Sequence, residues 1–118
     1  MSGMPGQLWQ NWGKNIAYNL SVAERAHELL DNILQYLTNQ FKNELVAKHL
    51  MDEIEQIYDH LEENPLQFPS CRDMYLATRG CLEAVIGQMD YVIVFTIKTD
   101  FVDIAGIFHQ LEDYQKKL

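Results

Sequence analysis

Glu83, His109 and Tyr114 carry side chains that can transfer protons. A carboxylate can act as a general base, and an imidazole titrates near neutral pH, so it can give or take a proton. Each residue also has a structural interpretation. Glu83 would be a solvated carboxylate on a sheet, His109 would close the last strand with a hydrogen bond, and Tyr114 would pack its ring on the domain. We favour these structural roles and keep proton transfer as the alternative.

No metal or cofactor site is predicted. The run from His27 to Asp31 (HELLD) begins like the helix of a zinc protease, but Asp31 stands where the second histidine ligand is needed. His49 and His60 lie on one predicted helix, separated by about three turns, which is too far for one ion.

The chain has 118 residues, the length of one domain with a single core. The 9 Lys and Arg stand against 17 Asp and Glu, and the formal charge of −8 disfavours direct binding to nucleic-acid phosphates. No apolar stretch reaches the ~20 residues of a membrane helix, and the N-terminus lacks a signal-peptide pattern. The sequence therefore predicts a cytoplasmic protein without membrane or strong nucleic-acid contacts.

Cys71 and Cys81 are predicted to be free thiols. They flank a hairpin that would turn at Arg79-Gly80, and a register that pairs Thr78 with Cys81 places Cys71 well away from Cys81. Reduced thiols are also typical of a cytosolic chain.

Residues 1–13 are predicted to form a flexible arm and residues 14–118 the folded domain, because MSGMPGQLWQNWG has no helical or alternating period. The apolar anchors of this arm are Trp9 and Trp12. They either fold back onto the domain, which is the interpretation that we favour, or contact a partner.

Two amphipathic helices are predicted after a short strand. Ser21 and Glu24 have the spacing of a capping box, so the first helix should begin near residue 22. The second helix should end before Pro65, because the residue that precedes a proline is pushed out of the helical region. The short connection between them implies an antiparallel hairpin, whose apolar stripe a sheet must cover. The predicted ranges are a strand at 15–20 and helices at 22–41 and 44–63.

Four strands are predicted after Pro65. They are rich in β-branched and aromatic residues, and their short polar connections require antiparallel pairing. The predicted fold class is α+β, with an antiparallel sheet meander, an N-terminal strand and an α-helical hairpin on one face, in the order β-α-α-β-β-β-β. The predicted strands of the meander are 73–78, 81–86, 91–97 and 102–108.

Four segments carry a family resemblance. NLSVAERAHELLDNILQYL is typical of an opening strand, serine cap and first helix, and NELVAKHLMDEIEQIYDHLEENP of a second helix with its proline. RGCLEAVIGQMDYVIVFTI and VDIAGIFHQLEDY are typical of paired strands and a terminal histidine segment. In this order they resemble the RelE/ParE toxin superfamily over about residues 15–118. The resemblance implies the toxin of a type II toxin–antitoxin system, held inactive by a cognate antitoxin, that needs no cofactor and acts on the ribosome or on DNA gyrase.

The residues around Gly80 distinguish these targets. The nuclease members of the superfamily are similar here but carry arginines where Leu82, Val92 and Gln110-Leu111 stand. Loss of one fixed donor to a developing oxyanion typically costs ~10²–10³ in rate, so the resemblance favours a protein target, with gyrase as the candidate. A weak ribosome-dependent mRNA endoribonuclease and a degenerate member that only binds antitoxin stay open as alternatives. The residues of the nuclease site would be Arg79, Glu83, His109 and Tyr114.

The partner contacts are predicted from charge. An acidic row on the second helix favours an antitoxin segment that carries Lys or Arg around an apolar anchor and lies in the groove between the helical hairpin and the sheet. The final segment, 108–118, is the expected contact with a gyrase-like target. Both a homodimer and a hetero-oligomer with the antitoxin are compatible with the sequence. The predicted contact residues are Trp9, Trp12, Asp52, Glu55, Asp59, Glu62, Phe108 and Asp113.

Overall fold

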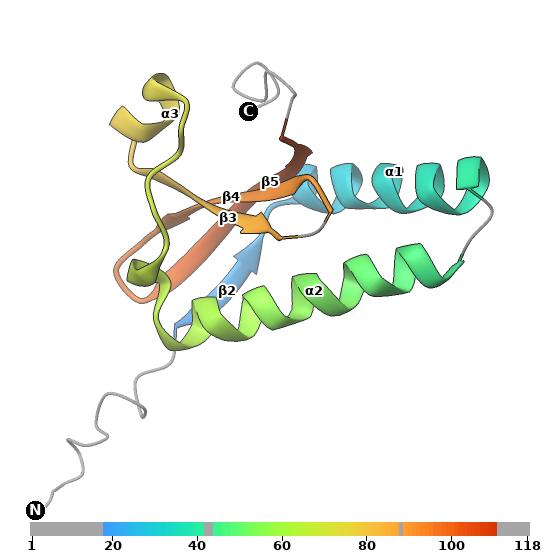
Figure 1. Ribbon diagram of the computed structural model, residues 1–118. Coiled ribbons are helices and arrows are strands. Elements are labelled where there is room, and N and C mark those ends of the chain that lie inside the picture. Colours follow the sequence, from blue (N-terminus) through green and yellow to red (C-terminus); the bar gives the residue numbers. More distant parts are fainter. Residues whose placement is uncertain (1–17, 42–43, 88, 111–118) are drawn as a thin grey trace, which may run out of the picture.

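A computed structural model describes residues 18–41, 44–87 and 89–110 of the chain. A four-stranded sheet lies beside a hairpin of two long helices (Figure 1). The predicted α+β class and the helical hairpin are confirmed. The elements are, in chain order, β2 (Asn19–Val22), α1 (Glu24–Phe41), α2 (Glu44–Glu63), the 3₁₀ turn η2 (Pro65–Gln67), α3 (Met74–Thr78), β3 (Cys81–Ile86), β4 (Tyr91–Ile97) and β5 (Phe101–His109).

The sheet is mixed. Its strand order is β2-β5-β4-β3, and β2 runs parallel to β5 while the other neighbours are antiparallel. The prediction of a wholly antiparallel sheet is therefore wrong at the β2 edge. A short connection determines only the relative direction of the two strands that it joins. The partner of β2 is β5, which is far from β2 in the sequence, so no short connection determines their relative direction.

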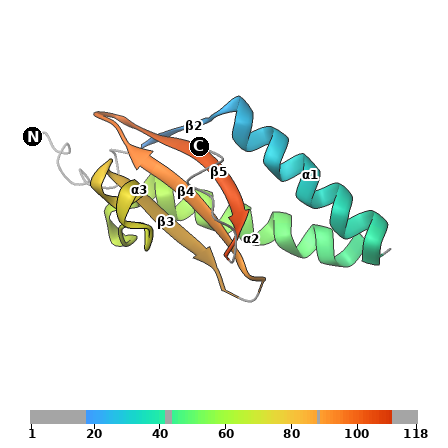
Figure 2. The ribbon, with the colours of Figure 1, turned by 90° about the horizontal axis from the view of Figure 1, so that it is seen from above.

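The helical hairpin packs on the sheet through α1, which contacts β5, and α2, which contacts β2 and β3. Leu50, Ile54 and Leu61 recur with the helical period on α2 and are buried, which explains why this face points inward. In Figures 1 and 2 the helices spread apart toward β2.

The first helix begins two residues later than predicted, at Glu24. Ser21 and Val22 belong to β2, where they pair with Asp103 and Ile104 of β5, and the Ala23 N–H donates to the Ile104 carbonyl oxygen at 3.0 Å. The predicted capping box is therefore wrong: Ala23 stands directly before the first helical residue, its carbonyl oxygen accepts the His27 N–H at 3.1 Å, and Ser21 lies two residues earlier, in the strand.

The strand predicted at 73–78 is the helix α3. Asp73 caps it, since its Oδ1 accepts the Leu76 N–H at 3.0 Å and its carbonyl oxygen accepts the Ala77 N–H at 2.9 Å. Local side chain to backbone bonds of this kind compete with strand pairing, and here they prevail over the β-forming residues. In both ribbon views α3 stands apart from α1 (Figure 2).

Both cysteines are free, as predicted, but the register behind that prediction is wrong. Because α3 replaces the first hairpin strand, the segment before it runs back along β3, and Ser70 bridges Leu82 in antiparallel fashion. The Cys71 N–H donates to the Cys81 carbonyl oxygen at 3.1 Å. The two cysteines are therefore neighbours.

Candidate functional site

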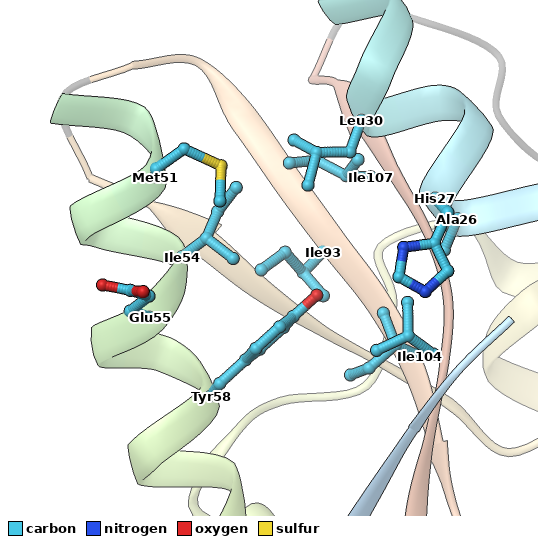
Figure 3. A pocket seen from close by; sticks show the side chains of 12 residues that line it. Ala26, His27, Leu30, Met51, Ile54, Glu55, Tyr58, Ile93, Ile104 and Ile107 are labelled. Atoms are coloured by element: carbon cyan, nitrogen blue, oxygen red, sulfur yellow. The ribbon is translucent and has the colours of Figure 1, made fainter. Parts of the chain in front are cut away.

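An apolar cavity of about 290 Å³ lies between the two long helices and the sheet. Figure 3 shows α2 on one side, α1 on the other and the sheet behind. The predicted groove between hairpin and sheet thus has a definite location, on the half of the hairpin nearest β2. Its lining residues are Val22, Ala26, His27, Leu30, Met51, Ile54, Glu55, Tyr58, Ile93, Ile104, Gly106 and Ile107.

Two small residues, on α1 and on β5, are among those that line this cavity. Ala26 of α1 has a single methyl group, and Gly106 of β5 has no side chain. A Cβ at Gly106 would lie 2.7 Å from the Phe108 ring and 3.1 Å from Leu29 Cδ1. Phe108 is fully buried, so Gly106 permits close packing of the ring beneath the cavity.

Three polar side chains, His27, Glu55 and Tyr58, join this apolar lining. In Figure 3 the Tyr58 ring extends from α2 toward the sheet residues, whereas Glu55 points away from them. Burial raises the pKa of the Tyr58 hydroxyl, so the group stays neutral and can donate a hydrogen bond. The cavity therefore offers an apolar interior with a carboxylate at its edge.

Glu55 belongs to the acidic row predicted on the second helix. Asp52, Glu55 and Asp59 are exposed, and Glu62 is half-buried. Their spacing places them along one face of α2. Asp52 already pairs with Lys48 at 3.0 Å, so Glu55 and Asp59 are the better candidates for an incoming cation.

The structure separates two residues of the predicted nuclease site, Arg79 and His109. The register pairs Cys81 with Thr96 at one end of the sheet and Tyr91 with His109 at the other, and Arg79 precedes Cys81. Five residue steps along β3 correspond to roughly 17 Å. Arg79 and His109 therefore lie toward opposite ends of the sheet, and Tyr114 lies outside the described residues, so the nuclease site stays a prediction.

Glu83 is buried, at 3% exposure, on the sheet face opposite the cavity, because its neighbour Ala84 pairs with the cavity residue Ile93. Its Oε1 accepts the Arg72 backbone N–H at 3.1 Å, and its Oε2 lies 3.4 Å from the Arg72 Nε. The expectation of an exposed carboxylate is wrong. The observed bonds attach the 70–72 segment to β3, which is a structural role.

We expect the change Glu83→Gln to lower the free energy of unfolding by about 1–2 kcal/mol, because an amide loses the charge-assisted bond to Arg72 and turns an N–H donor toward its guanidinium. Urea denaturation measures the change, and Glu63→Gln on the exposed end of α2 is the matched control. Equal stability of the two variants would contradict the structural role.

Arg79 and His109 each have an aromatic neighbour. The Arg79 Nη1 donates to the Tyr75 hydroxyl at 3.3 Å, and its guanidinium carbon lies 5.5 Å from the centre of that ring. His109 is half-buried, with its ring 5.6 Å from the Tyr91 ring in edge-to-face geometry. With Tyr91, His109 lines a second, more open groove of about 490 Å³. This groove lies beside the end of α1 and the start of α2.

The other predicted contact residues have different locations. Phe108 is fully buried in β5, so its prediction as an exposed partner contact is wrong. Its aromatic ring packs in the hydrophobic core. Trp9, Trp12 and Asp113 lie outside the described residues.

Ala26, Tyr58 and Gly106 line the cavity but were not predicted as site residues. Their helical or alternating spacing was visible, but it does not distinguish a cavity wall from a filled core.

Within residues 18–41, 44–87 and 89–110, no three His, Cys, Asp or Glu side chains gather as a metal site. In the same part of the chain, none of the helices combines the length and the apolar character needed to cross a bilayer.

Comparisons with known proteins agree with this architecture. The family model described as ParE toxin of type II toxin-antitoxin system, parDE, matches residues 20–114. A solved structure, "Chromosomal ParDE TA system from P. aeruginosa", is similar with a TM-score of 0.65 at 18% identity, over 79% of this chain and 96% of that one. No curated protein matches.

These findings place the chain in the RelE/ParE superfamily, as the sequence resemblance predicted. Within it, the chain belongs to the ParE toxin family, since the family model covers most of its length. It is the toxin component of a type II toxin–antitoxin system.

Proposed function

We propose that this toxin inhibits growth from the cytoplasm by binding a protein target, with DNA gyrase as the candidate, and that a cognate antitoxin neutralises it. The observation that carries the choice of a protein target is the separation of Arg79 from His109 by the length of β3. Cleavage of RNA needs a base, an acid and a cation at one phosphate. Glu83, the predicted base, lies on the sheet face opposite the cavity, and its carboxylate is bound by Arg72. We therefore do not assign it the role of general base.

Induced expression in a bacterium, with and without the neighbouring gene, tests the toxin and its neutralisation together. We expect growth arrest without the neighbour, recovery with it, and loss of supercoiling activity when purified gyrase is incubated with the toxin. Normal growth despite abundant soluble protein would contradict the proposal. Transcripts cleaved in a translating extract, and left intact by the His109→Ala variant, would instead support the nuclease alternative.

The cavity supports the proposal for the antitoxin. Its interior is formed mainly by aliphatic side chains from α1, α2 and the sheet, and the exposed Glu55 is among its lining residues. An amphipathic helix that docks in a groove inserts apolar anchors and places polar groups at the rim. We therefore assign an apolar anchor of the antitoxin to this cavity and Lys or Arg residues to the acidic row of α2.

Association with this antitoxin is expected to slow as salt is added, because complementary charges accelerate encounter and salt screens them. The double variant Glu55→Gln/Asp59→Asn should associate several-fold more slowly at low salt, whereas each rim pair contributes only ~0.2–1 kcal/mol to affinity. Stopped-flow or biosensor rates at low and high ionic strength measure both effects. The control, Glu24→Gln/Asp31→Asn, makes the same chemical changes at exposed positions of α1. A wild-type rate that stays constant or rises with salt would refute the charge assignment.

A further inference from the structure

Cys71 and Cys81 occupy opposing positions on two antiparallel segments. Ser70 bridges Leu82, the Cys71 N–H donates to the Cys81 carbonyl oxygen at 3.1 Å, and the Glu83 N–H donates to the Pro69 carbonyl oxygen at 3.0 Å. One step along this register from Ser70 and Leu82 places Cys71 directly across from Cys81. Residues paired in this way have Cα atoms about 5.5 Å apart and side chains on the same face, a separation that a disulfide can span.

The two thiols differ in their surroundings. Burial, together with the nearby charges of Glu83 and Cys81, raises the pKa of the Cys71 thiol to about 12. Burial also raises the pKa of the Cys81 thiol, but the positive charges of Arg79 and Lys98 oppose that shift. Cys81 is also the more exposed, at 8% against 4%. Cys81 is therefore the thiol that ionises first and reacts first.

We propose that Cys71 and Cys81 form an oxidisable dithiol, a modification site at which a low-molecular-weight disulfide such as oxidised glutathione closes an intramolecular disulfide. The Cys81 thiolate attacks one sulfur of oxidised glutathione, forms a mixed disulfide and releases one glutathione thiolate. Cys71 then gives up its proton and attacks the Cys81 sulfur, which expels the second glutathione. Together the two protein thiols lose two electrons and two protons. The two molecules of reduced glutathione take up these electrons and protons.

This bond would join the two ends of the segment that carries α3. The loop between the cysteines contains Arg79 and the exposed side chains of Met74 and Tyr75. In the reduced protein only noncovalent contacts hold this segment, among them the Arg72–Glu83 pair and the Asp73 cap. Oxidation would restrict the segment without changing the residues that line the cavity.

Incubation of the reduced, full-length protein in glutathione redox buffers, followed by acid quench and intact mass measurement, tests the proposal. We expect the folded chain to lose the mass of two hydrogens and to form the bond about tenfold more readily than the same chain unfolded in urea. Trypsin cleaves after Arg72 and Arg79, so the cysteines fall on separate peptides, and a linked pair identifies the bond.

The variant Cys71→Ser is expected to stop at the mixed disulfide on Cys81, with the mass of one added glutathione. Each of three results would overturn the proposal: mixed disulfides without linked peptides in the wild type, bonds between two chains in place of bonds within one, or equal disulfide formation in the folded and the urea-unfolded chain.

Discussion

The change Ala26→Leu is expected to weaken antitoxin binding by roughly 100-fold while the toxin stays folded and toxic. The larger side chain projects into the cavity of about 290 Å³ and takes the space that we assign to the apolar anchor of the antitoxin. Because the added methyl groups fill existing space, the fold should lose little stability. Titration calorimetry with the protein encoded by the neighbouring gene measures the affinity, and co-expression measures the failure to rescue growth.

Ala47→Leu is the matched control for this change. Ala47 is half-buried on α2, and it is not among the residues that line the cavity. The control should keep its antitoxin affinity within a few-fold of the wild type. If Ala26→Leu is folded by circular dichroism and still binds antitoxin as tightly as Ala47→Leu does, the assignment of the anchor to this cavity is wrong.

The change Gly106→Ala is expected to lower the free energy of unfolding by about 2–3 kcal/mol, in the upper half of the range for overpacked cores. The new methyl group would lie 2.7 Å from two atoms of the Phe108 ring and 3.1 Å from Leu29 Cδ1. Phe108 is fully buried, so its ring cannot move aside without displacing other core residues. Urea denaturation gives the stability, provided that the slope of the transition is unchanged.

Gly87→Ala provides the comparison for this glycine. It makes the same chemical change in the β3–β4 turn, where a Cβ meets nothing within 4 Å. Gly87→Ala should change the free energy of unfolding by no more than about 0.5 kcal/mol, as other surface substitutions do. A stability for Gly106→Ala as high as that of Gly87→Ala would show that the ring can relax and that Gly106 is not required for packing.

Local periodicity was sufficient for the long elements. The apolar positions of 44–63 repeat with the helical period, and α2 has these bounds. The runs 81–86 and 91–97 are β3 and β4, since β-branched and aromatic residues suit a pleated, largely buried surface. The family resemblance was also readable, because it depends on the order and spacing of such elements.

The short segments needed information from beyond their own residues. Residues 74–78 contain good strand formers, yet the Asp73 cap and the burial of Leu76 make them helical. Ser21 lies in a strand because β5 pairs with it, and β5 is some eighty residues further along the chain. A local pattern reports the preference of a segment, whereas a distant partner decides between preferences of similar energy.

The features of the candidate site fall into the same two groups, those that the sequence predicts and those that depend on the fold. Residue types and their spacing are enough to predict which face of the second helix is acidic and which residues can carry protons, and the family resemblance adds that the arginines of the nuclease members are replaced here. The packed fold was needed to learn that Glu83 is buried against Arg72, that Arg79 and His109 lie toward opposite ends of the sheet, and that Cys71 opposes Cys81. The two groups differ because charge and periodicity are properties of individual residues and their near neighbours. Distance, burial and empty space arise only when strands and helices far apart in the chain pack against one another.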